Sequence, residues 1–139
     1  MNLRTISTFF ATGVLLIAGG FSVEFGNPKA VNDPKAADAA VIVRAVGCHE
    51  PEKAKFTVTA EGTVDGKRQS LPVQLTALST PGMYAVKKQW PDNGKFVLVF
   101  NATFDGHFVS SAVLPLKDGE PQRTLAKVYR RETNSQDWQ

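Results

Sequence analysis

The sequence predicts an all-β protein, a single antiparallel sandwich of seven strands that follows an N-terminal signal peptide. Three observations predict this class. Apolar and polar residues alternate in short runs, Gly, Pro, Asn and Asp separate these runs, and no helical period extends beyond about two turns. About 100 residues of domain suffice for two packed sheets with a shared core.

Residues 1–22 have the pattern of a secretory signal peptide. Arg4 is their only charged residue, and an apolar run follows from Phe9 to Phe21. This run is short for a membrane span, which needs about 20 apolar residues. We expect cleavage near Gly20 or Ser22, export to the periplasm or extracellular space, and no membrane span in the mature form. A retained N-terminal membrane anchor is the alternative.

Charge and cysteine content limit the possible partners. The chain carries 16 Lys and Arg against 13 Asp and Glu, and removal of Arg4 with the signal leaves 15 against 13, or +2. This near balance gives no reason to expect nucleic acid or an anionic membrane as partner. Cys48 is the single cysteine, so the domain has no internal disulfide and depends on its core.

The first part of the mature chain differs in composition from the rest. Residues 23–38 contain the repeats NPKA and DPKA and few large apolar side chains, which predicts a flexible linker. We expect the sandwich domain to span residues 39–131. Residues 132–139 are polar and are expected to form a frayed tail.

The first three expected strands are 39–47, 55–62 and 70–79. The first is a β-branched run that ends at a glycine, and the second alternates strictly between apolar and polar residues. The sequence VDGK at 64–67 is a turn signal between the second and third. Pro72 cannot donate to a sheet ladder, so the third strand is expected at an edge or at a bulge.

The next two expected strands, 83–90 and 95–104, flank the turn sequence PDNG at 91–94. The alternation in 83–90 places Trp90 on the same side as Tyr84, which predicts a core position at one end of the sandwich, over Phe96. A surface aromatic residue for carbohydrate stacking is the alternative for Trp90.

The last two expected strands are 108–116 and 123–131. The sequence DGH at 105–107 provides the turn before them, and KDGEPQ at 117–122 separates them. Pro115 predicts an edge or bulge position in the first of the two strands.

The stretch PGMYAVKKQWPDNGKFVLVF resembles the E–F hairpin of small exported bacterial immunoglobulin-like or fibronectin-like modules. Gly82 and Tyr84 open one strand of this hairpin, and Gly94 and Phe96 open the next. The resemblance covers about 20 residues, and it implies the seven-stranded sandwich of that family. Such modules are mostly non-enzymatic, and no ligand carries over because no binding motif is shared.

One cluster contains residue types that bind metals. Cys48, His49 and Glu50 lie in the sequence GCHEP, and His107 is the other histidine of the chain. If every connection reverses the chain, His107 lies at the same end of the sandwich as residues 48–50. A thiolate and two imidazoles suit Zn(II) or copper, although the spacing matches no zinc or blue-copper pattern. Solvated side chains, or an intermolecular disulfide at Cys48, are the alternatives.

Catalysis is not expected. Cys48 and His49 are neighbours, and neighbours on an extended chain point to opposite faces, which makes a poor nucleophile–base pair. Triad residue types occur at Asp105, His107, Ser110 and Ser111, but their crowding into one turn and one strand start disfavours a working relay. No HExxH, GxSxG or Gly-rich phosphate loop is present.

The sequence therefore predicts an exported, non-catalytic binding module without a cofactor. Its partner is an unknown protein or envelope component, and the domain is of a size that can be monomeric. The expected contact surface consists of the loops 48–54, 79–82 and 105–107. The alternative is a small metal-binding protein that uses Cys48, His49 and His107.

Overall fold

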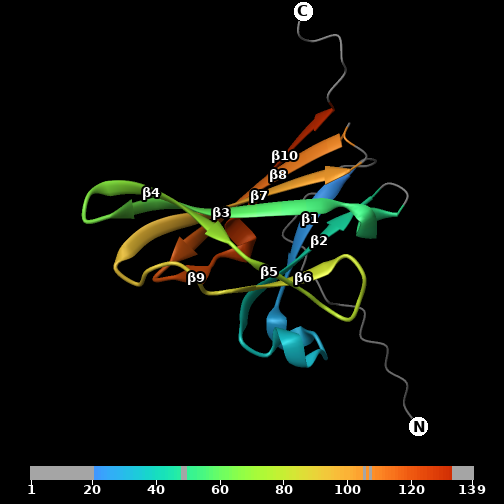
Figure 1. The fold of residues 1–139 in the computed structure, drawn as a ribbon, viewed down its shortest axis with the longest axis horizontal. Helices are drawn as coiled ribbons and strands as arrows, with labels where there is room; N and C mark the ends of the chain where they lie inside the picture. The colour runs from blue at the N-terminus through green and yellow to red at the C-terminus, as the bar shows by residue number, and fades with distance from the viewer. Residues whose placement is uncertain (1–20, 48–49, 105, 107, 133–139) are drawn as a thin grey trace, which may run out of the picture.

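The structure is a computed structural model, and it describes residues 21–47, 50–104, 106 and 108–132. The chain forms two antiparallel β-sheets whose inner faces share one apolar core (Figure 1). The prediction of an all-β sandwich is therefore confirmed. In these residues, no helix has both the length and the apolar character that crossing a membrane requires.

The smaller sheet has four strands in the order β1-β2-β6-β5. They are β1 (Ser22–Gly26), β2 (Ala39–Val46), β5 (Leu75–Ala77) and β6 (Met83–Lys87). All three neighbouring pairs are antiparallel. The short strands β1 and β5 are its two edges.

The larger sheet has six strands, with the order β10-β8-β7-β3-β4 and with β9 paired to β8. They are β3 (Lys55–Val64), β4 (Lys67–Val73), β7 (Gly94–Phe104), β8 (Phe108–Lys117), β9 (Glu120–Pro121) and β10 (Lys127–Glu132). The β3–β4 hairpin turns at Asp65 and Gly66, whose φ angles of 51° and 75° are those that a type I′ turn requires.

The core lies between the sheets and consists of the alternate residues that the period-2 pattern assigned to one face. Leu98 and Phe100 of β7 are fully buried in it. Across the core, the ring of Phe25 on β1 meets Phe100 edge to face at 4.8 Å between centroids. Aromatic pairs in this arrangement add to the stabilisation that their buried area provides.

The expected flexible linker at 23–38 is wrong. Its beginning belongs to β1, which pairs with β2 from Ser22 opposite Val46 to Gly26 opposite Ile42. Val23 and Phe25 are buried between the sheets. The Pro- and Ala-rich composition of the whole segment obscured this short alternating run at its start.

The rest of this segment covers the outer face of the smaller sheet. It contains two single turns of 3₁₀ helix, η1 (Pro28–Ala30) and η2 (Pro34–Ala36), and Ala36 packs there in a second small apolar cluster with Ile42. Asp33 fixes the segment, because its carboxylate accepts hydrogen bonds from the backbone N–H of Ser79 at 2.7 Å and of Lys35 at 3.0 Å. These two bonds lower the pKa of Asp33.

The expected number of seven strands is also corrected, because the described residues form ten. The expected strand 70–79 is divided into β4 and β5 by a break at Gln74, and β1 and β9 were not expected. The edge position predicted for Pro72 is confirmed, whereas the edge or bulge position predicted for Pro115 is wrong, because β8 lies between β10 and β7. Pro72 lies on the edge strand β4, and Pro115 faces the gap between β10 and β9, where its carbonyl accepts a bond from the N–H of Gln122.

Trp90 has a structural position, as the alternation predicted. It lies just after β6, is buried in the main core together with Phe96, and donates its indole N–H to the carbonyl of Gly119 at 3.1 Å. This bond satisfies the polar atom of the ring and ties the β6–β7 connection to the β8–β9 turn.

Candidate functional site

One side of the sandwich is open because β4 leaves the larger sheet early. Val73, the last residue of β4, pairs with Val58 of β3, and the chain then crosses at Gln74 into β5 of the smaller sheet. Lys55–Thr57 of β3 therefore pair with β7 on one side and with no described strand on the other. We name this unpaired side of Lys55–Thr57 the free edge of β3.

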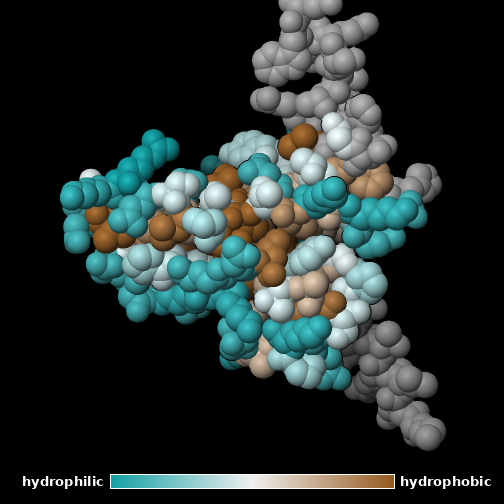
Figure 2. Space-filling model, in the orientation of Figure 1, coloured by the Kyte–Doolittle hydropathy of each residue, from teal (hydrophilic) through white to brown (hydrophobic). Residues whose placement is uncertain are grey.

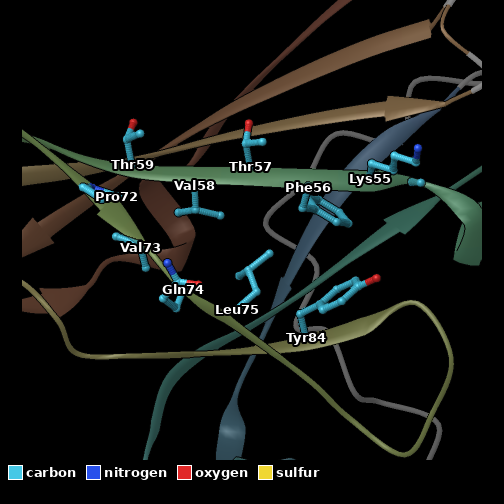
Figure 3. A pocket seen from close by; sticks show the side chains of 11 residues that line it. Lys55, Phe56, Thr57, Val58, Thr59, Pro72, Val73, Gln74, Leu75 and Tyr84 are labelled. Atoms are coloured by element: carbon cyan, nitrogen blue, oxygen red, sulfur yellow. The ribbon is translucent and has the colours of Figure 1, made fainter.

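A hollow of about 600 Å³ lies beside the free edge (Figure 3). We name it the side hollow. Its lining comes from the start of β3, from the crossing between the sheets and from β6: Ala54, Lys55, Phe56, Thr57, Val58, Thr59, Pro72, Val73, Gln74, Leu75 and Tyr84.

The inner lining of the side hollow is apolar and aromatic. Phe56, Leu75 and Tyr84 point into the space between the sheets, and the rings of Phe56 and Tyr84 meet edge to face at 5.6 Å (Figure 3). All three side chains are only half-buried. Figure 2 shows hydrophobic surface along this side of the molecule, between hydrophilic areas. Concave apolar surfaces of this kind are typical of binding sites.

The crossing that borders the side hollow is fixed by one side chain. The amide of Gln89 accepts from the backbone N–H of Gln74 at 2.8 Å and donates to its carbonyl at 3.0 Å. The same amide also donates to the carbonyl of Lys87 at 3.0 Å. Gln89 thus replaces the strand neighbour that Gln74 lacks.

The charges near the side hollow are unevenly arranged. Lys55 is exposed at its rim and forms no ion pair within the part of the chain that the structure describes. Lys53, just before it, is bound to Glu50 at 2.9 Å, and this contact raises the pKa of Lys53. Farther along the outer face of β3, the hydroxyl of Ser70 donates to Glu61 at 2.6 Å and lowers the pKa of Glu61.

The residues of the predicted metal site, Cys48, His49 and His107, lie outside the described residues. Their described neighbours reach the same end of the sandwich, because Lys55, which follows that loop, pairs with Thr103 near the end of β7. Within the described ranges, no group of three or more His, Cys, Asp or Glu side chains is arranged to hold a metal ion.

Two of the three loops expected to form a contact surface are adjacent. A Cβ atom placed on Gly82 would come within 2.7 Å of the Cα of Glu52, so the loops 50–54 and 79–82 touch. Gly82 has a φ of 81°, which also favours glycine. The loop 105–107 lies mostly outside the described residues.

The serines weighed as triad members point to different environments. Ser110 is fully buried on the core side of β8, and its hydroxyl has no hydrogen-bond partner in the described structure. Ser111 donates on the outer face to the Oδ1 of Asn101 at 2.6 Å. Neither hydroxyl lies beside a titratable base among the described contacts, and His107, the base considered for them, lies outside the described residues.

Sequence reasoning missed the side hollow. Leu71, Val73 and Leu75 keep a period of two through the crossing, because both sheets turn their inner faces to the same core. The alternation therefore predicts one continuous strand. The polar pair Gln74 and Gln89, separated by 15 residues, is the one signal of a break, and it is visible only once the fold is known.

Comparison of the chain with protein-family models, with curated proteins and with solved structures found no match.

Proposed function

We propose that this chain is an exported, non-catalytic module that binds a partner through the side hollow. One observation carries this proposal. Phe56, Leu75 and Tyr84 are half-buried around an open space of about 600 Å³, whereas equivalent inward residues such as Leu98 are fully covered. Concave apolar surfaces with a few polar groups at the rim are the usual form of a binding site.

The chemistry of the lining favours binding over catalysis. Beside its carbon surface it offers the hydroxyl of Tyr84 and the amide of Gln74, with the ammonium of Lys55 at its rim. The side chains of Thr57 and Thr59 point away from the side hollow (Figure 3). Neither a carboxylate, an imidazole nor a thiol is among the residues that line the side hollow in the described structure. The described lining therefore lacks imidazole and carboxylate groups, which are the most frequent general bases, and this supports a binding role.

Two further parts of the proposal are that the chain is exported and that it is related to immunoglobulin-like or fibronectin-like modules. Export depends on residues 1–22, and N-terminal sequencing of the protein from its native cells tests whether they are cleaved. A mature N-terminus near residue 21 supports a cleaved signal peptide, whereas an intact Met1 in the membrane fraction supports the retained anchor and an intact Met1 in the cytosol contradicts export. The relationship to immunoglobulin-like or fibronectin-like modules depends on the stretch from Pro81 to Phe100. The expected hairpin in this stretch is wrong, because β6 pairs with β2 and β5 whereas β7 pairs with β3 and β8, so the two strands lie in different sheets.

Photo-crosslinking in the native host tests the binding site. Benzoylphenylalanine replaces Gln74, whose side chain is exposed and lines the side hollow, and in a matched variant it replaces the exposed Asn93 in the β6–β7 turn. We expect a discrete adduct from position 74 and none from position 93. Absence of an adduct at 74, or equal adducts at both positions, would contradict the proposed site.

A further inference from the structure

We propose that the partner is an extended polypeptide segment that adds to the free edge of β3, places an apolar side chain in the side hollow and sets a carboxylate against Lys55. This inference rests on the proposed function and names the class of partner. An extended peptide added to a sheet edge obtains affinity from main-chain hydrogen bonds and specificity from pockets for alternate side chains.

The backbone supplies the first step. β4 pairs with β3 from Val64 to Val58 and then leaves the sheet, so the positions opposite Lys55, Phe56 and Thr57 are vacant in the described structure. Polar backbone groups on this edge face solvent and are available to a new strand. An incoming strand there continues the line of β4, antiparallel to β3.

The register then determines where the side chains of the partner lie. Directly opposed residues on adjacent strands place their side chains on the same face of the sheet. Phe56 points inward and Thr57 outward, as Figure 3 shows. The residue opposite Phe56 therefore enters the side hollow beside Leu75 and Tyr84, which suits an aromatic or long aliphatic side chain.

The charge of Lys55 determines which residue of the partner fits opposite it. Lys55 is outward-facing and has no ionic partner in the described chain, whereas Lys53 is already paired with Glu50. Opposite charges that face each other across two strands attract, and like charges repel. A segment that reads Thr, then a large apolar residue, then Glu therefore complements Thr57, Phe56 and Lys55 in antiparallel order.

A synthetic peptide tests this inference directly. The probe is acetyl-Gly-Gly-Thr-Phe-Glu-Gly-amide, titrated into the ¹⁵N-labelled chain and followed by NMR shifts and amide exchange. We expect shifts confined to the side hollow and slower exchange of at least one amide among residues 55–57. Replacing the Phe of the probe by Ala should weaken binding at least tenfold, because the buried apolar area is lost.

Matched variants test strand pairing and charge separately. A probe N-methylated at Thr, Phe and Glu keeps the side chains but lacks the donors, and it should not bind measurably. Lys55→Glu should weaken binding of the Glu probe about threefold and favour a probe with Lys in its place. Lys95→Glu, an exposed lysine on the outer face of β7 opposite Thr63, should leave both affinities unchanged.

The outcomes separate this inference from the proposed function. If position 74 crosslinks in cells but the N-methylated probe binds as tightly as the parent, the side hollow binds a partner and strand addition is wrong. Failure of every probe to bind would also overturn strand addition. A dimer joined through residues 55–57, seen by sedimentation and by protection of these amides in the free protein, would make a second copy of this chain the occupant and overturn the assignment.

Discussion

Two parts of the interior differ in how many strands flank their residues. The closed part surrounds Phe100, and the open part is the side hollow around Phe56. Phe100 has β3 on one side, where it faces Val58, and β8 on the other, where it faces Ala112. Phe56 points into the same space from β3, but it has β7 on one side and no described strand on the other. The same residue type is thus fully buried in one place and partly exposed in another, according to the path of β4.

The largest expected effect is in the closed part. Phe100→Ala should lower the free energy of unfolding by about 3–5 kcal/mol, because it removes a fully buried ring and leaves a cavity. Urea denaturation followed by circular dichroism measures this change. A loss below about 1 kcal/mol would show that the two sheets are not packed around this ring.

The same substitution in the open part should cost less. Phe56→Ala should lower the free energy of unfolding by about 1–2 kcal/mol, since part of the ring already contacts water in the folded state. Urea denaturation under the same conditions gives the comparison. A cost equal to that of Phe100→Ala would mean that the side hollow is closed in solution, which removes the basis of the proposed function.

A smaller effect is expected where the two parts meet. Gln89→Ala removes three hydrogen bonds at the crossing and should cost about 0.5–1.5 kcal/mol, because water replaces them in part at this exposed site. The amide of Gln74 should then exchange faster in hydrogen-exchange NMR. Gln122→Ala is the control, since this partly exposed side chain donates a single bond to the carbonyl of Glu120. Equal protection of Gln74 in both variants would contradict the role of Gln89.

The smallest expected effect concerns Asp33, which lies outside both parts of the interior, and the pH dependence of stability. The pKa of Asp33 is lowered in the folded state, first by the N–H of Ser79 and then by that of Lys35. The stability that Asp33 provides is therefore present above its unfolded pKa of about 3.9 and is lost as pH falls through the lower folded value. Asp33→Asn should reduce the loss of stability below about pH 4, as measured by thermal unfolding at several pH values.

Glu61 provides the control for this acid titration. Its pKa is also lowered, chiefly by the hydroxyl of Ser70, on the outer face of the other sheet. Glu61→Gln should remove a separate part of the stability that is lost at low pH. In the double variant with Asp33→Asn, the two effects on stability should add. An unchanged acid profile for Asp33→Asn would show that the segment on the smaller sheet is not fixed by this carboxylate.

The sequence predicted the parts of the fold that depend on local pattern. The alternation of Phe96, Leu98 and Phe100 identified β7, and the Asp65-Gly66 turn identified the β3–β4 hairpin. β1 was missed because five residues beside Pro-rich turns carry too few alternations to be separated from a linker. Its burial comes from pairing with β2, and such long-range pairing leaves little trace in a local window.

The candidate site was not predictable in the same way. Residue types selected Cys48, His49 and His107, whereas the side hollow consists of Phe56, Leu75 and Tyr84, which read as ordinary core residues. Their exposure depends on a strand that is missing beside them, and a sequence pattern does not record a missing neighbour. The turn sequence that contains Gly82 did predict the loop 79–82, which the structure places against the loop 50–54.

The single-residue crossing at Gln74 has a geometric consequence for any ligand. Two peptide steps from Val73 to Leu75 span at most about 7 Å, less than the roughly 10 Å that separates face-packed sheets. The two sheets must therefore lie closer together at Gln74 than they do toward Lys55. The space between them narrows from Lys55 to Gln74. If the side hollow binds a partner as proposed, a side chain that enters from the Lys55 end should meet the converging layers near Gln74, and this would limit the length of the side chain that fits.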